Sequence, residues 1–310
     1  MPKEPTKMAK NQLLGNDLIK YWLLNTTSAN TRDAKRVDIE GFIYDNNIKS
    51  IDDFKKIKRK DIIDWRDILT KKYSLRTTKR KMSMVSKFFE YLCDENLLSA
   101  NVVIGVQRPK LTANEGATSA ISNHQARDFL EAPDPKTLKG KRDRAILATF
   151  LFHGLRRSEL CQLRLKDIQE RDGIKQFKVL GKGDKERYIP IHPTAQRFIK
   201  EYLDEYGQQN DKETALFRSL SNNGKNTSDR IITPSAVYQI VKYYGGKVGI
   251  DLSNFSPHSL RATAATNTLL NGEDLRKVQQ WLGHSSIQTT SMYDKRDNRP
   301  EDSPTYRVRY

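Results

Sequence analysis

The C-terminal half of the chain contains histidine, arginine and tyrosine residues at spacings that suit chemistry on a phosphodiester. His258 and Arg261 are three residues apart in PHSLRATAAT, so they share one face of a predicted helix. His284 lies in LGHSSIQTT, before a predicted helix start, and Tyr293 follows nine residues later in TTSMYDK. A nucleophilic hydroxyl and groups that bind an anion therefore occur within one short stretch.

Two further basic residues precede this stretch. Arg156 stands at a predicted helix start in HGLRRSEL, and Lys182 stands in a Gly-Lys-Gly turn between two predicted strands. Taken singly, these two are typical surface cations, a lone histidine is typical of a surface or a core, and Tyr293 is typical of a half-buried helix residue. The order and spacing of the whole set, rather than any one residue, indicate a function.

A tyrosine hydroxyl has a pKa of ~10 and is mostly protonated at neutral pH. We expect nearby cations to lower the pKa of Tyr293 and to offset the charge that builds at phosphorus in a transition state. Arginine suits this task because its guanidinium group forms bidentate bonds to phosphate oxygens. A covalent phosphotyrosine preserves the phosphodiester linkage, so the reaction needs no ATP.

Other phosphodiester chemistries lack their motifs in this sequence. It contains no carboxylate cluster for two-metal catalysis, no GxxxxGK[ST] loop and no GxSxG elbow. Cys93 and Cys161 lie far apart within helical patterns, so they are expected to be small buried residues rather than a zinc site or a disulfide. We therefore expect neither a metal ion nor a cofactor.

The charge of the chain favours a nucleic-acid partner. Its 310 residues include 55 Lys and Arg against 38 Asp and Glu, a net charge of +17, and the excess is positive on both sides of residue 110. No apolar run reaches the ~18 residues that span a bilayer, and the N-terminus lacks an apolar signal segment. We therefore expect a cytoplasmic, nucleoid-associated protein without membrane contact.

Residues 10–105 have the apolar periodicity of successive helices, with predicted helices at 30–46, 58–70 and 74–95. The last of these carries a basic cluster near its start, formed by Arg76, Lys79, Arg80 and Lys81. Cations are unfavourable at a helix N-terminus unless an anion offsets them. Contact with DNA phosphates is one interpretation of this cluster, and a solvated basic face is the other.

Residues 106–119 lack apolar periodicity and are the expected linker, so residues 120–310 form the expected second domain. Alternating patterns predict a small antiparallel sheet with one hairpin, from strands at 163–168, 174–180 and 187–191. Most other segments of this domain are expected to be helices, including 274–282 and 286–293. Residues 207–230 are expected to form a long polar surface loop. The predicted fold class is mainly α with a small antiparallel β-sheet (α+β).

Four segments in order resemble the tyrosine recombinase or phage integrase family, which includes the Xer recombinases. HGLRRSELCQLRLKDI is similar to the first arginine box of that family, and VLGKGDKERYIPI is similar to its hairpin lysine segment. SPHSLRATAATNTLL resembles its H-x-x-R box, and QWLGHSSIQTTSMY resembles its last histidine box and nucleophile. The resemblance is strong over residues 120–295. Over residues 10–105 it is only topological, and there it implies the family's helical, SAM-like core-binding domain, which closes over DNA.

The resemblance implies a role for each matched residue. Arg156 and Arg261 would clamp the scissile phosphate, and Lys182 would donate a proton to the departing 5′ oxygen. Tyr293 would attack phosphorus and leave a 3′-phosphotyrosine. Two rival nucleophiles, Tyr306 and Tyr310, are disfavoured because they lie in an irregular tail further from the histidine box.

The two histidines and one acidic residue complete the implied site. His258 and His284 would contact the phosphate, and one of them would take the proton from the nucleophile. Glu159, one helical turn after the first arginine, resembles the acidic residue that steadies the site. The sequence departs from many family members at Ala262, where a second histidine is common; that position is only supportive, so activity is still expected.

The resemblance also implies partners. These are double-stranded DNA with inverted half-sites and further copies of the chain, as a dimer on a site and a tetramer in the synapse, together with accessory proteins. Pro300 and Pro304 disfavour a long terminal helix, so the C-terminal tail is expected to be extended or a short strand that docks in trans. About ten residues precede the first predicted helix, which favours simple Xer-like sites over an added arm-binding domain.

Two other functions remain open at this point. One is that of a type IB topoisomerase, which uses similar chemistry. The other is that of an inactive DNA-binding protein on the same fold. Among recombinases, integration or excision of a mobile element, Xer-like resolution and an integron-like role are all compatible with the residues.

Overall fold

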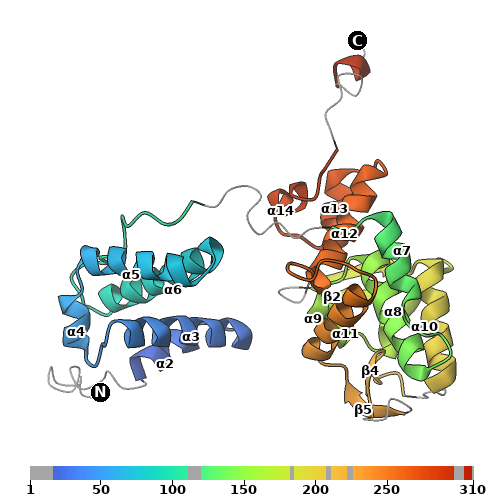
Figure 1. Ribbon diagram of the computed structural model, residues 1–310, viewed down its shortest axis with the longest axis horizontal. Coiled ribbons are helices and arrows are strands. Elements are labelled where there is room, and N and C mark those ends of the chain that lie inside the picture. Colours follow the sequence, from blue (N-terminus) through green and yellow to red (C-terminus); the bar gives the residue numbers. More distant parts are fainter. Residues whose placement is uncertain are drawn as a thin grey trace. The chain divides into compact units, whose positions relative to one another are not determined.

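The computed structural model describes residues 17–110, 120–181, 185–206, 211–221, 226–296 and 304–308. The chain folds as two compact units, residues 1–116 and residues 117–310 (Figure 1). Helices dominate both units, and the second also contains two small antiparallel sheets, which confirms the predicted fold class. In the described part of the chain, no helix is both long and apolar enough to cross a membrane.

The first unit is helical throughout its described secondary structure. Its helices are α2 (Asp17–Leu24), α3 (Ala29–Asp45), α4 (Ile51–Lys56), α5 (Arg59–Lys72) and α6 (Leu75–Asp94). The helix predicted at 74–95 begins as expected because the Ser74 side chain accepts a hydrogen bond from the Thr77 backbone N–H. The predictions at 30–46 and 58–70 are likewise confirmed by α3 and α5.

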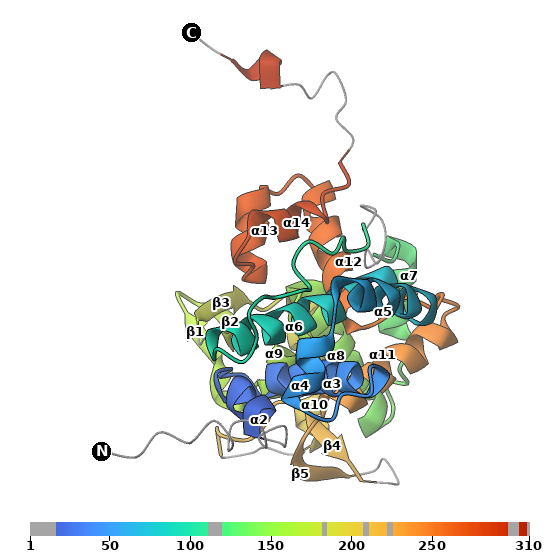
Figure 2. The same cartoon turned by 90° about the vertical axis from the view of Figure 1, so that its left-hand side faces the viewer.

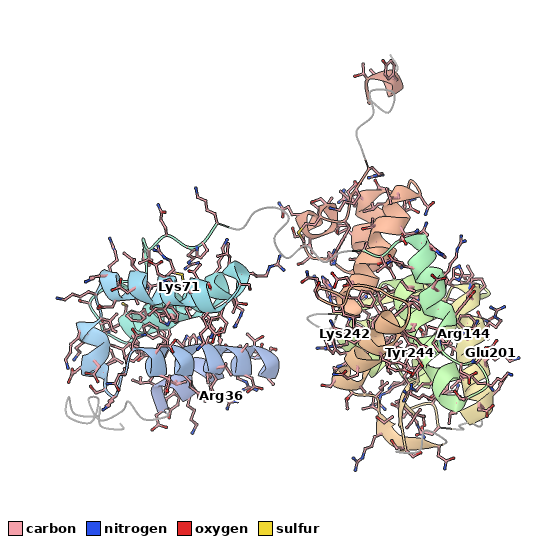
Figure 3. The ribbon with its side chains drawn as sticks, in the orientation of Figure 1. Arg36, Lys71, Arg144, Glu201, Lys242 and Tyr244 are labelled. Carbon is pink, nitrogen blue, oxygen red and sulfur yellow. The ribbon has the colours of Figure 1, made fainter. Side chains whose placement is uncertain are left out.

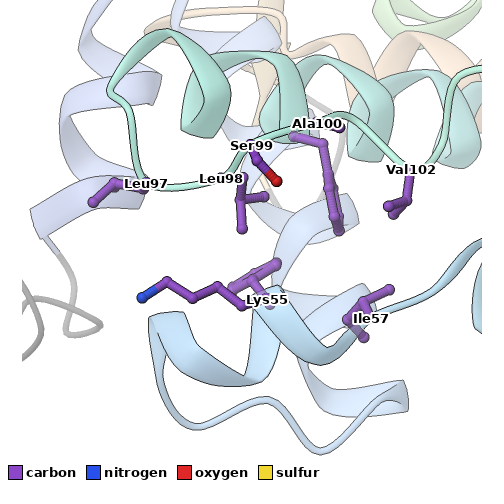
Figure 4. A pocket seen from close by; sticks show the side chains of 9 residues that line it. Lys55, Ile57, Leu97, Leu98, Ser99, Ala100 and Val102 are labelled. Carbon is purple, nitrogen blue, oxygen red and sulfur yellow. The ribbon is translucent and has the colours of Figure 1, made fainter.

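Aromatic side chains fill the core of the first unit. Phe42 packs edge-on against Trp65 and Phe89, with ring centroids 4.8 and 5.9 Å apart, and Phe54 contacts Phe88 and Phe89 in the same way. A pocket of about 360 Å³ opens beside this core, between α4 and the segment after α6 (Figure 4). None of the predicted catalytic residues lines it.

The first unit extends further along the chain than predicted. Val106 is buried in its core, the Gln107 carbonyl accepts a hydrogen bond from Arg66, and Arg108 donates one to Ser83. The expected linker at 106–119 therefore begins too early, because the apolar contact of Val106 with the helices gives no periodic signal in the sequence.

Helix α8 (Leu138–His153) is the central helix of the second unit. The helices are α7 (Asn123–Glu131), α8 (Leu138–His153), α9 (Arg157–Gln162), α10 (Pro193–Tyr206), α11 (Pro234–Lys247), α12 (Pro257–Leu270), α13 (Leu275–Leu282) and α14 (Ile287–Ser291). Residues 145–150 of α8 are all buried, since α10 and α12 pack against it (Figure 1). A helix segment buried on every side lacks a polar face, which explains why residues 145–150, AILATF, are apolar apart from Thr149, whereas the first half of α8 is charged.

The sheet differs from the prediction at its first strand. The strands are β1 (Ile168–Arg171), β2 (Ile174–Leu180) and β3 (Glu186–Pro190), in the order β1-β2-β3 and antiparallel throughout. The strand predicted at 163–168 is wrong: Leu165–Asp167 is a 3₁₀ helix. The Asp167 carboxylate accepts a hydrogen bond from the Arg164 backbone N–H, and this local cap favours a turn over an extended strand.

Two predicted irregular segments contain regular structure. The loop expected at 207–230 contains β4 (Arg218–Leu220) and most of β5 (Thr227–Ile231). These two strands pair as a second antiparallel sheet (Figure 2). Strands this short carry too few residues to show an alternating pattern. In the tail, Pro304–Arg307 is a 3₁₀ helix rather than the expected extended chain or strand.

Candidate active site

The first arginine of the site stands where two helices meet. Helix α8 ends at Gly154, whose φ of 57° closes the helix, and Arg156 then forms the N-cap of α9. The Arg156 backbone N–H donates to Glu159 Oε2 at 2.7 Å, and its Nη1 donates to Glu159 Oε1 at 2.8 Å. One carboxylate thus fixes both the backbone and the side chain of Arg156.

Arg261 reaches the same place from the middle of α12, where it is almost fully buried. Its Nη1 donates to the Gly154 carbonyl at 2.5 Å and its Nη2 donates to the Leu282 carbonyl at 2.7 Å. Arg156 in turn donates from Nη2 to the Gly283 carbonyl at 2.9 Å. The C-terminal ends of α8 and α13 therefore hold both guanidinium groups, since the last carbonyls of a helix carry partial negative charge.

Burial and charge act on Arg261 together. Burial is the main cause that lowers the pKa of Arg261 to about 10, and Arg156 adds to the effect, whereas Glu159 opposes it. At neutral pH the group remains cationic. Two neighbouring cations that share one carboxylate leave a local excess of positive charge, which a bound anion would offset.

A third arginine, not among the predicted site residues, contacts the same carboxylate. Arg187 of β3 donates from Nη1 and Nη2 to Glu159 Oε1 and Oε2, at 3.1 and 2.8 Å. Burial alone would raise the pKa of Glu159, but the hydrogen bonds from Arg187 and from the Arg156 backbone outweigh it, so this pKa lies below its ordinary value. Glu159 is therefore an anion among three arginines.

His284 is fixed by a threonine that sequence reasoning also missed. Its Nδ1 lies 2.9 Å from Oγ1 of Thr290, which is fully buried in α14. Burial, followed by the charges of Arg261 and Arg156, lowers the pKa of His284 to about 4. The imidazole is therefore neutral at physiological pH, and its Nδ1 is already engaged.

Tyr293 lies in the turn after α14, whereas a helix over 286–293 was predicted. Its backbone N–H donates to the Thr290 carbonyl at 3.0 Å. The side chain is buried against α12 and α13, with its ring centroid 6.1 Å from that of His284. Its hydroxyl oxygen lies 3.3 Å from Nε2 of His258.

In the free protein, burial outweighs the expected effect of the cations on the pKa of Tyr293. Burial raises the pKa of Tyr293 above its ordinary value, although Arg261 and Arg156 each lower it. The expectation of a lowered pKa is therefore wrong for this state, because the same packing that places the phenol also removes it from water. A proton acceptor near the hydroxyl is correspondingly more important.

An open cavity of about 310 Å³ lies beside these groups. Its lining includes Arg156, His258 and Arg261, together with Tyr238 and Ser256. The structure thus brings Arg156, Glu159, His258, Arg261, His284 and Tyr293 into one linked cluster. Lys182 lies outside the described residues.

The predicted basic cluster of the first unit divides in two. Arg80 and Lys81 both pair with Asp38, a fully buried carboxylate of α3. An internal anion therefore offsets these two cations. The Arg76 and Lys79 side chains are exposed, as are Arg36 and Lys71 on neighbouring helices (Figure 3).

Both missed site residues lie inside segments that the sequence had already singled out. Arg187 lies in VLGKGDKERYIPI and Thr290 lies in LGHSSIQTT. The sequence indicated the two segments but not the roles of these two residues, because each contact joins residues whose proximity depends on the fold. Among the described residues, no cluster of histidine, cysteine or carboxylate side chains is arranged to hold a metal ion.

Comparison with known proteins identifies the family of this chain. Residues 119–299 match the model of the phage integrase family. The chain is 34% identical over 271 residues to tyrosine recombinase XerC of Herpetosiphon aurantiacus, covering 86% of this chain and 84% of that protein. It is 32% identical over 277 residues to tyrosine recombinase XerD of Haemophilus ducreyi, covering 88% of this chain and 89% of that protein.

Solved structures share the fold at lower sequence identity. A lambda integrase (75–356) dimer bound to a COC′ core site superposes with a TM-score of 0.71 and 16% identity, covering 91% of this chain and 94% of that one. XerH bound to a palindromic difH substrate gives a TM-score of 0.64 and 24% identity, covering 76% and 68%.

Fold, residue order and sequence similarity together define a tyrosine-type site-specific recombinase. The chain belongs to the phage integrase family.

Proposed function

We propose that this recombinase cuts and rejoins DNA through a 3′-phosphotyrosine on Tyr293, without metal or ATP. The observation that carries the proposal is the position of its hydroxyl, 3.3 Å from His258 Nε2. That histidine lines the same cavity as Arg156 and Arg261. The proposed proton acceptor therefore lines the same cavity as the two proposed phosphate-binding arginines and lies within reach of the proposed nucleophile.

Binding of the scissile phosphate is assigned to Arg156 and Arg261. Each guanidinium group is held by carbonyl oxygens on one side, which fixes its plane before DNA arrives. Preorganised donors stabilise a phosphorane-like transition state strongly because they need no rearrangement during the reaction. His284, neutral and anchored through Nδ1, presents its other ring nitrogen for hydrogen bonding to the same phosphate.

In the proton transfers, His258 is the proposed acceptor for the Tyr293 proton because it is the histidine within reach of the hydroxyl. The Tyr293 oxygen attacks phosphorus, and the bond from phosphorus to the 5′ oxygen breaks. Lys182 is the proposed donor of the proton to that departing oxygen, on the strength of its place in the hairpin segment of the family. Rejoining reverses these steps.

The proposed DNA target is a duplex with inverted half-sites, bound by a dimer, with a tetramer in the synapse. Among proteins of this fold, lambda integrase occurs as a dimer on a core site and as a tetramer on a Holliday junction. The net charge of +17 supports binding to a polyanion. Arg76 and Lys79 are the proposed phosphate contacts of a core-binding domain formed by the first unit, with Arg80 and Lys81 held mainly by Asp38.

The C-terminal tail is proposed to dock on a neighbouring copy in the assembled complex. Tyr306 and Val308 support this proposal, because both are large apolar-bodied side chains that are exposed in the single chain. For the biological role we propose either Xer-like resolution or integration and excision of a mobile element, assisted by accessory proteins. The similarity to XerC and XerD favours sites of the simple Xer type.

The decisive experiment traps the covalent intermediate. A nicked suicide substrate loses the leaving strand, so an active enzyme accumulates as a protein–DNA adduct. We expect an adduct with the wild type and with Tyr306→Phe and Tyr310→Phe, but none with Tyr293→Phe. An adduct formed by Tyr293→Phe would disprove the assignment of the nucleophile, and a wild type without adduct would favour an inactive DNA-binding protein.

A topoisomerase-like function is separated by a second substrate. Supercoiled plasmid that lacks any recombination site should stay supercoiled with this enzyme. Relaxation of such a plasmid at the rate seen with a site-bearing plasmid would instead favour a type IB topoisomerase.

A further inference from the structure

Arg187 connects three segments of the second unit. It belongs to β3, its Nε donates to the Trp281 carbonyl at 3.1 Å, and its two Nη groups donate to the two oxygens of Glu159. Trp281 is in the last turn of α13, and Glu159 is in α9. One largely buried guanidinium therefore joins the hairpin strand to α9, which Arg156 caps, and to α13, whose Leu282 carbonyl accepts a hydrogen bond from Arg261.

Two glycines make room for this group. A Cβ atom on Gly181 would lie 3.3 Å from Arg187 Nη1, and one on Gly283 would lie 3.2 Å from the same atom. Both distances are tighter than ordinary van der Waals contacts. Gly181 follows β2, and Gly283 closes α13 with a φ of 66°. The guanidinium therefore fits closely between the base of the hairpin turn and the end of a helix.

The hairpin turn begins at this contact. The Gly181 N–H donates to the Lys185 carbonyl at 2.8 Å, and Val179 pairs with Arg187 in the strand register. Lys182 is the next residue in sequence after Gly181. Whatever fixes Gly181 relative to α9 and α13 also fixes where the chain enters the segment that carries this lysine.

We propose that Arg187 is a positioning residue for the leaving-group step, which holds the base of the β2–β3 turn in register with Glu159 and the end of α13. The inference rests on the proposed function, since it takes Lys182 as the proton donor to the 5′ oxygen. It assigns Arg187 no contact with DNA. Its geometry, rather than its charge, is the property required, because a lysine lacks the planar fork that spans both Glu159 oxygens and the Trp281 carbonyl.

A substrate with sulfur in place of the bridging 5′ oxygen tests this assignment. When Tyr293 attacks phosphorus in such DNA, the bond from phosphorus to sulfur breaks and a thiolate leaves, which needs no proton. The cleavage rate on this substrate is therefore insensitive to a misplaced proton donor, but it remains sensitive to loss of phosphate binding.

We expect Arg187→Gln to slow cleavage of ordinary DNA by about 10²-fold, the size of effect typical of a catalytic group misplaced by ~1 Å. On the sulfur substrate its rate should return to near that of the wild type, as should that of Lys182→Ala. Arg187→Lys should behave like Arg187→Gln. Gly181→Ala, which retains Arg187 but crowds it, should show a smaller loss that the sulfur substrate also restores.

Arg171→Gln is the matched control. It removes a cation from the same sheet, where Arg171 stacks on Tyr188 with its guanidinium carbon 3.7 Å from the ring centroid, and it should cleave both substrates normally. DNA binding and thermal unfolding of each variant show whether the fold is retained. If Arg187→Gln does not fold, Arg187→Lys and Gly181→Ala still decide the question.

The outcomes separate this inference from the proposed function. Equal loss on both substrates by the Arg187 variants, with Lys182→Ala restored by sulfur, would overturn the positioning role and leave the proposed mechanism intact. Wild-type rates for Arg187→Lys on ordinary DNA would overturn it as well, since charge alone would then suffice. Failure of sulfur to restore Lys182→Ala would overturn both the proton-donor assignment and the inference.

Discussion

Replacement of Glu159 by glutamine tests whether one carboxylate organises the site. Glu159 accepts two hydrogen bonds at Oε2, from the Arg156 backbone at 2.7 Å and from Arg187 Nη2 at 2.8 Å. A glutamine of the same shape retains one oxygen, but its amide NH₂ faces donors where Oε2 had accepted. The substitution therefore removes two charge-assisted hydrogen bonds and leaves three arginines without their common anion.

The magnitude follows from these contacts. Each hydrogen bond to a charged group contributes about 1.5–3 kcal/mol, so the loss of two gives about 3–6 kcal/mol. The Arg187 and Arg156 side chains are 13% and 33% exposed, so water reaches the charges left without their common anion and compensates part of the loss. The lower half of this range, about 3–4.5 kcal/mol, therefore applies. For a unit of this size, about 3–4.5 kcal/mol corresponds to a fall in Tm of about 6–18 °C.

Calorimetry of the full chain measures this change. The pH dependence adds a second, independent check, because the folded-state pKa of Glu159 is lowered. A carboxyl whose pKa is lowered on folding stabilises the protein above its unfolded pKa of ~4.3 and loses that contribution as pH falls through the folded value. The difference between wild type and Glu159→Gln should therefore be full at pH 7 and shrink below pH ~4.

Glu213→Gln is the matched control. Glu213 forms an exposed ion pair with Lys166 at 2.7 Å, and removal of such a pair changes stability by less than about 1 kcal/mol. If Glu159→Gln were as stable as this control, Glu159 would not hold the arginines and the reasoning would fail.

Three further predictions concern other parts of the second unit. Gly154→Ala should lower the free energy of unfolding by about 1–3 kcal/mol in urea titrations, because its φ is 57° and the new Cβ would lie 2.7 Å from Leu282 Cδ2; an unchanged midpoint would contradict the contact. The unfolding free energy of the wild type should fall as pH drops from 7 to about 4.5. Burial is the largest cause that lowers the pKa values of His153 and His284 to about 4 in the folded protein, so over this range the unfolded chain binds more protons than the folded one. A flat profile of unfolding free energy against pH would contradict this. Deletion of residues 297–310 should impair tetramer assembly more than binding to a single site in native gels, and equal loss of both would exclude docking of the tail in trans.

The sequence alone determined the order of the segments and the local structure that begins them. The pairing of Arg156 with Glu159 can be predicted from the sequence because residues three apart face each other at a helix start. Proline and serine marked where helices begin, as at Ser74 and Pro257. Short-range rules of this kind depend only on neighbours in the chain.

The tertiary structure decided which distant groups share a charge. Arg187 meets Glu159 across 28 positions, and Arg261 meets the Gly154 carbonyl across 107. The pairing of Arg80 with Asp38 likewise changed the interpretation of a basic cluster that the sequence showed only as cations. No periodic pattern encodes such contacts, because they arise when separate helices and strands pack together.

The same reason explains Tyr293. Its identity and its place after His284 were fixed by the sequence, and nearby cations alone favoured a lowered pKa. Only packing against α12 and α13 sets how far the hydroxyl is removed from water, and that burial raises the pKa while placing the oxygen beside His258. The sequence determined which residues are present for the chemistry, and the tertiary structure determined their protonation and their partners.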